Sequence, residues 1–208
     1  LNAASDALGG GTVAPGNTGG VADLSTVGQL NATGAVTLGT ASTAGVAHLA
    51  IEIGGTNDGT TGGNTTGPLQ YDRVAMSGST LTLNEANLDI SPVNGFAYSS
   101  PSYNNSTQQF NLDGHIFFLI TGASNVVGTF ANQFAVGSDP NAPAFATIYG
   151  TDGQEFAISY TANFATDSLT GGNDVAIMAI PEPNSMAMLA GSLGMALGLQ
   201  RFRRRRKA

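Results

Sequence analysis

The last 28 residues set the strongest limit on what the whole chain can fold into. Residues 185–199 carry no charge and are rich in Leu, Met, Ala and Gly, which predicts one apolar helix. At about 1.5 Å per residue this helix would span roughly 22 Å, and snorkelling arginines would cover the rest of a bilayer core of about 30 Å. A basic cluster closes the chain: Arg201, Arg203, Arg204, Arg205, Arg206 and Lys207. Since positive charge favours the cytoplasmic side, we expect one C-terminal transmembrane helix, with residues 1–180 outside.

A short proline motif, Pro181-Glu182-Pro183, precedes this helix. Its two rings exclude a helix and hold the segment extended, in the form that a processing enzyme can grip. Motif, apolar helix and basic end together resemble the PEP-CTERM sorting signal of bacterial exported proteins. The resemblance covers residues 180–208 and implies that an exosortase, a membrane cysteine protease or transpeptidase, recognises the proline motif. It also implies that residues 181–208 are a sorting signal and that the processed protein resides in the cell envelope, at the cell surface or in the extracellular matrix.

The part before residue 181 is strongly acidic and poor in helix formers. It holds 13 carboxylates and a single cation, Arg73, which leaves a net charge of −12. Such a surface repels phosphate backbones, so we expect no nucleic-acid partner. Only 10 % of the whole chain is charged, and its 29 Gly together with many Thr, Asn and Ser favour strands and turns over helices. Residues 1–180 are therefore predicted to be one all-β extracellular domain.

Short segments of alternating or continuous apolar residues predict about ten strands. They are residues 30–38, 46–53, 71–76, 80–83, 88–90, 115–121, 126–130, 145–149, 155–160 and 175–180. In residues 46–53 one face holds Leu49, Ile51 and Ile53, and the other holds His48 and Glu52. Residues 115–121 are continuously apolar, as in a strand buried on both faces, whereas residues 92–108 predict a long surface loop.

Residues 30–34 and 74–78 are similar in pattern, at a spacing of 44. This spacing favours stacked coils over a single sandwich. Residues 11–17, 71–74, 117–121, 128–131 and 173–175 also resemble the end of autotransporter-type passenger repeats, although Arg73 departs from that pattern. The resemblance implies a right-handed β-solenoid with or without a sandwich-like cap. Because the chain opens at Leu1 without an apolar signal segment, we expect it to be part of a longer exported solenoid.

No catalytic constellation is evident, so we expect a protein that is not an enzyme. A groove enzyme on such a fold needs a basic side chain, and Arg73 is expected to pair with its neighbour Asp72 instead. A zinc site using His48 and His115 lacks a third ligand. Without cysteine there is neither a disulfide nor a thiolate site. No cofactor is expected; the only candidate calcium ligands are Asp58 and Asp174, in Gly-rich turns without a toxin-type repeat period.

These observations predict a structural, adhesive or matrix protein sorted to the surface by its tail. The alternative is a carbohydrate-binding or carbohydrate-active protein of the exopolysaccharide matrix. In that alternative Tyr98, Tyr103 and Tyr149 serve as sugar platforms. A third hypothesis is self-association through an exposed edge strand.

Overall fold

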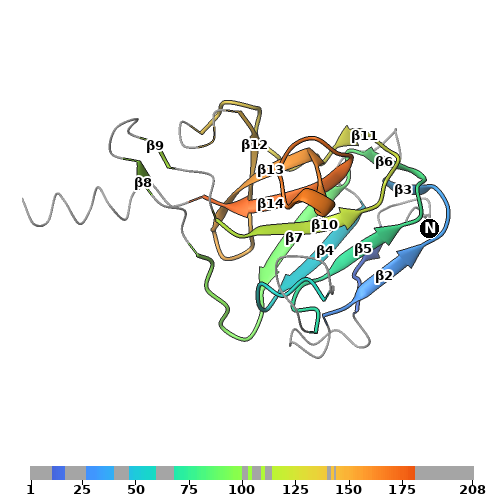
Figure 1. The fold of residues 1–208 in the computed structure, drawn as a ribbon, viewed down its shortest axis with the longest axis horizontal. Helices are drawn as coiled ribbons and strands as arrows, with labels where there is room; N and C mark the ends of the chain where they lie inside the picture. The colour runs from blue at the N-terminus through green and yellow to red at the C-terminus, as the bar shows by residue number, and fades with distance from the viewer. Residues whose placement is uncertain are drawn as a thin grey trace, which may run out of the picture.

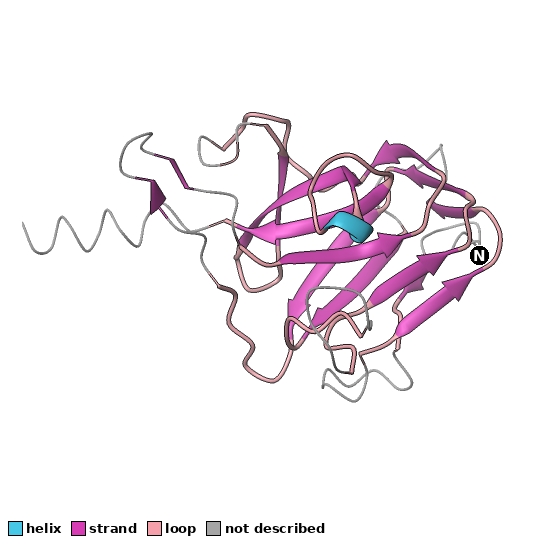
Figure 2. Cartoon of the chain, viewed as in Figure 1, coloured by secondary structure: helices cyan, strands magenta, loops and turns pink. Residues whose placement is uncertain are grey.

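The chain is all-β, as predicted (Figures 1 and 2). A computed structural model describes residues 11–16, 27–39, 47–59, 68–99, 103–104, 109–110, 114–139, 142 and 144–180. One turn of 3-10 helix, η1 (Phe164–Thr166), is the only helical element in these ranges. No helix among the described residues reaches the length and apolar character that spanning a bilayer requires. The predicted membrane helix at residues 185–199 lies outside those ranges.

The strands form three successive groups along the chain. The first group is β2 (Gln29–Ala32), β3 (Val36–Gly39) and β4 (His48–Ile53), and the short strand β1 (Thr12–Val13) lies before it in the chain. The second is β5 (Arg73–Met76), β6 (Thr80–Asn84) and β7 (Asn87–Pro92). The third is β8 (Tyr103–Asn104), β9 (Gln109–Phe110), β10 (Ile116–Thr121), β11 (Asn125–Thr129), β12 (Ala146–Tyr149), β13 (Glu155–Ala162) and β14 (Asp174–Ala179).

Strands of one group pair in parallel with their counterparts in the next. The resulting sheets are β1-β4-β7, β3-β6-β11 and the run β2-β5-β10. Leu30 lies opposite Val74, so the similarity between residues 30–34 and 74–78 reflects stacked strands 44 residues apart. Gly78 and Gly122 occupy the same corner of successive levels, both at positive φ, with Gly78 N donating to Gly122 O. We call these parallel levels the stack.

The stack gives way to an antiparallel extension at β10. There β14, β13 and β12 continue the third sheet in antiparallel order, to give the six strands β12-β13-β14-β10-β5-β2. No closed solenoid is seen among the described strands. Parallel pairing continues only as long as successive levels offer matching strands, and β14 occupies the edge of β10 that a further level would use.

One apolar core joins the stack to the extension. It takes side chains from all three sheets, among them Leu49 of β4, Leu81 of β6, Phe117 of β10 and Phe156 of β13. Leu49, Ile51 and Ile53 are buried, as the alternation predicted. In β10 both Phe117 and Phe118 are buried, because η1 and its flanks cover the outer face of the sheet with Phe164.

One strand prediction and one loop prediction were wrong in detail. Residues 30–38 form β2 and β3 with a corner between them, because the chain turns so that Ala32, Val36 and Leu38 all point inward. Residues 92–108 are not wholly a surface loop. Pro92 ends β7, and Phe96 and Tyr98 pack against the core, the Tyr98 ring lying 4.9 Å from Phe156.

Candidate functional site

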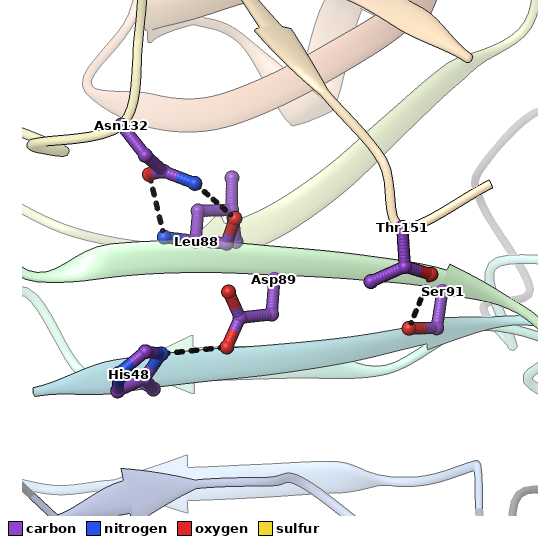
Figure 3. A network of polar contacts seen from close by, with 6 residues as sticks. All are labelled: His48, Leu88, Asp89, Ser91, Asn132 and Thr151. Atoms are coloured by element: carbon purple, nitrogen blue, oxygen red, sulfur yellow. Dashed lines mark hydrogen bonds and ion pairs between the residues drawn. The ribbon is translucent and has the colours of Figure 1, made fainter. Parts of the chain in front are cut away.

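The best candidate site is the outer face of β4 and β7, where polar side chains gather (Figure 3). Strand alternation turns Leu49 and Ile51 into the core, so that His48 and Glu52 face outward. Parallel pairing places Glu52 opposite Ser91 and Ala50 opposite Asp89. We call His48, Glu52, Asp89 and Ser91 the polar face.

His48 of β4 and Asp89 of β7 lie at ion-pair distance. His48 Nδ1 lies 2.7 Å from Asp89 Oδ2, and the two side chains are 34 % and 40 % exposed. The sequence pattern grouped His48 with Glu52 on one face; the hydrogen-bonding partner is instead Asp89, 41 residues away on the next level. The sequence spacing of 44 does not give this pairing, because β4 and β7 pair at a spacing of 39, with His48 opposite Asn87.

The polar face lacks the proton relay of a serine hydrolase in the part of the chain that is described. The Ser91 hydroxyl forms a 3.0 Å hydrogen bond with Thr151 Oγ1, on the side away from His48 (Figure 3). Asn132 braces the same strand: its Oδ1 accepts from Leu88 N and its Nδ2 donates to Leu88 O, both at 2.9 Å. The Ser91 hydroxyl is therefore not aligned for proton transfer to His48.

Asp72 and Arg73 do not pair with each other, which corrects the prediction. Asp72 Oδ1 accepts from Gly28 N at 2.8 Å and its Oδ2 from Glu52 N at 3.1 Å, so it ties two levels of the stack together. Burial raises the pKa of Asp72 to about 7, against the lowering effect of both N–H donors. The Arg73 guanidinium donates to Gln29 Oε1 and lies 5.1 Å from the Phe164 ring centre. Neighbours in a strand point to opposite faces, and local pairing fails for that reason.

The candidate metal ligands are not brought together. Asp174 accepts from Gly122 N and Phe164 N, each at 2.8 Å, and so fastens η1 to the corner of β10. Asp58 is buried at 5 % exposure in a separate turn. His115 packs edge-on against Phe117, and burial lowers its pKa. Within the described ranges, no three His, Asp or Glu side chains are grouped so as to hold a metal ion.

Of the three predicted sugar platforms, only Tyr149 is shown as an exposed ring. It is 47 % exposed and meets Phe134, itself 50 % exposed, edge to face at 5.5 Å. Tyr98 is partly buried, with its ring in T-shaped contact with Phe117 and Phe156. The side chain of Tyr103 lies outside what the structure describes. A pocket of about 320 Å³ opens nearby, lined by neutral groups that include Gln133, Val136 and Tyr160.

The sorting motif and the basic cluster also lie outside the described residues. Ile180, the residue before the sorting motif, is hydrogen-bonded at both backbone groups. Its N–H donates to Glu155 O at 2.8 Å, and its carbonyl accepts from Gln154 Nε2 at 2.6 Å. Comparison of the chain with protein-family models, with curated proteins and with solved structures finds no match.

Proposed function

We propose that this protein is an exported, surface-sorted structural or adhesive protein of the extracellular matrix, processed at residues 181–183 by an exosortase-type enzyme. In this proposal the stack is the C-terminal end of a right-handed β-solenoid, and the antiparallel extension is its cap. Residues 185–199 cross the membrane until processing.

The observation that carries the proposal is the stack itself. Successive parallel levels, whose paired residues lie 39 apart (His48 and Asn87) to 46 apart (Val74 and Ile120), build an elongated body whose length grows with the number of levels. Such bodies present long binding surfaces. The last described residue, Ile180, is hydrogen-bonded to Glu155 and directly precedes the proline motif in the sequence. A processing enzyme would then meet an extended motif beside a folded domain.

Intact-mass measurement of the protein from the cell-surface fraction tests the sorting step. Wild type is expected to lack the basic cluster, whereas the double substitution Pro181→Ala and Pro183→Ala should retain it and stay in the membrane fraction. Pro68→Ala, at an exposed turn position of the body, is the matched control and should be processed as wild type. Unchanged processing of the Pro181/Pro183 variant would refute the sorting role.

The Phe134–Tyr149 pair favours carbohydrate binding as a second candidate function. Exposed aromatic faces bind the apolar side of a sugar ring, and a neutral pocket with hydroxyl and amide groups lies close to them. Titration of exopolysaccharide fragments into the protein should show binding that Tyr149→Ala abolishes. Tyr149→Phe, which retains the ring, is the control and should retain binding.

A further inference from the structure

A pocket opens at the β12 edge of the six-stranded sheet, where β12 is shorter than its partner β13. β12 begins at Ala146, which lies opposite Ile158, whereas β13 continues to Ala162. The pocket of about 320 Å³ lies beside this overhang, between β13 and the loop that precedes β12. Its volume falls within the range of about 300–1,000 Å³ that is common for small-molecule sites.

The lining of the pocket combines an aliphatic wall with one amide side chain. The wall is formed by side chains of the loop and of both strands, among them Val136, Ala144, Ala146 and Ile158. Gln133 supplies the one amide side chain among the described lining residues, and Thr, Ser and Tyr hydroxyl groups complete the lining. A ligand that fits this lining must therefore present an apolar group and a hydrogen-bonding group together.

The hydrogen bonds of Tyr160 fix the orientation of the Gln133 amide. Tyr160 Oη accepts from Phe130 N at 3.0 Å, so its own proton is donated to Gln133 Oε1, at 2.7 Å. Because the amide oxygen is turned toward Tyr160, the two N–H groups of Gln133 Nε2 are left for a ligand. The pocket thus offers a neutral donor beside an aliphatic wall.

The charges of the domain restrict the ligand further. No charged side chain lines the pocket in the part of the chain that is described. Residues 1–180 hold 13 carboxylates against the single cation Arg73, which donates to Gln29 at the opposite edge of the sheet. An anionic sugar such as a uronate would find no counter-charge here and would be repelled by the acidic domain. The pocket therefore favours uncharged sugar units.

We propose that this pocket binds the acetamido group of an uncharged N-acetylated amino sugar. The acetamido carbonyl accepts from Gln133 Nε2, and the methyl group packs against the aliphatic wall. A neighbouring sugar ring of the same glycan stacks on the Phe134–Tyr149 pair. A plain hexose carries a hydroxyl group in place of the acetamido group and leaves both the donor and the wall to water. The inference rests on the carbohydrate-binding candidate function and adds the class of sugar to it.

Calorimetric titration of the full chain, in a detergent without sugar head groups, tests the class of sugar with matched β-1,4-linked tetramers. The N-acetylglucosamine tetramer should bind about tenfold or more tightly than the glucose tetramer, because one hydrogen bond and one buried methyl group are added. The glucuronate tetramer should bind most weakly. Equal affinity for the first two tetramers, with both lost in Tyr149→Ala, would overturn the acetamido pocket but leave carbohydrate binding in place. Binding of none of the tetramers would overturn both.

Two variants separate the pocket from the aromatic pair. Gln133→Glu keeps an oxygen acceptor for Tyr160 Oη but removes both N–H donors, and Ala144→Leu fills the pocket from its exposed rim. Each should remove most of the preference for the N-acetylglucosamine tetramer while binding of the glucose tetramer stays unchanged. Ala135→Ser, exposed in the same loop but outside the pocket, is the matched control and should keep the preference. Full preference in both variants, with far-ultraviolet circular dichroism like that of wild type, would refute the proposal.

Saturation-transfer nuclear magnetic resonance with the N-acetylglucosamine tetramer gives an independent measurement. The acetyl methyl protons should receive the strongest saturation from wild type and markedly less from Ala144→Leu. Saturation confined to the ring protons in wild type would place the sugar on the aromatic pair alone and would contradict the pocket assignment.

Discussion

The stack and the antiparallel extension bury one common core but are built by different rules. In the stack, the same position recurs on each level, as Gly78 and Gly122 do at one corner. In the extension no position recurs, and aromatic rings such as Phe156 and Tyr160 fit particular neighbours. Repetition therefore builds the stack, and specific packing ends it.

The sharpest test of this comparison is whether the two regions unfold separately. Leu81→Ala in the stack is expected to cost about 2–5 kcal/mol and Phe156→Ala in the extension about 3–5 kcal/mol of unfolding free energy. Both side chains are fully buried in the same core, so each variant should still unfold in one transition. Denaturant titration followed by circular dichroism measures this. Val136→Ala, 65 % exposed, is the control and should change little. Two separated transitions in either variant would show that the regions are independent.

Asp72 gives the stack a pH dependence. Its folded pKa of about 7 exceeds the ordinary value of 3.8, so the folded protein retains a proton that the unfolded chain has lost between these values. Unfolding free energy should therefore fall as the pH rises from about 4 to about 7, by up to about 1.4 kcal/mol per pH unit. Asp72→Asn should reduce the slope. Some slope remains, because burial and the hydrogen bond with Asp139 raise the pKa of Glu155 in the extension too. An unchanged slope in Asp72→Asn would assign the pH dependence to the extension.

The corner glycines offer a smaller test of repetition. A Cβ at Gly122 would collide with Met76 O, whereas a Cβ at Gly78 meets nothing within 4 Å. Both residues have positive φ, so both substitutions to Ala carry backbone strain of about 1–3 kcal/mol. Gly122→Ala should therefore lower thermal stability more than Gly78→Ala does. An equal loss of thermal stability in the two variants would mean that the backbone around Gly122 accommodates a Cβ as easily as the backbone around Gly78.

The His48–Asp89 pair should have the smallest effect of all. Exposed ion pairs contribute about 0–1 kcal/mol, so a double-mutant cycle with His48→Ala and Asp89→Ala should give a coupling energy in that range. The coupling should weaken with added salt. A coupling energy well above 1 kcal/mol would show that the His48–Asp89 pair contributes substantially to the stability of the stack.

Local pattern was sufficient to predict the all-β class, the alternation of β4 and the burial of β10. Each of these follows from how apolar and polar residues succeed one another. The single cation of residues 1–180 and the order of proline motif, apolar segment and basic cluster are also read directly from the sequence. These properties depend on neighbours in the chain. They could therefore be predicted from the sequence alone. The predictions for residues 181–208 remain predictions.

Tertiary structure alone decided which distant residues meet. Arg73 binds Gln29 because pairing between levels places them opposite each other, whereas local pattern offered Asp72. His48 reaches Asp89 on the neighbouring strand, two residues beyond Asn87, which lies opposite it. The end of the stack is equally non-local, since it depends on β14 and Asn132 reaching two of its edges. Strand partners are selected by register and core packing over about 40 residues, and no short segment contains that information.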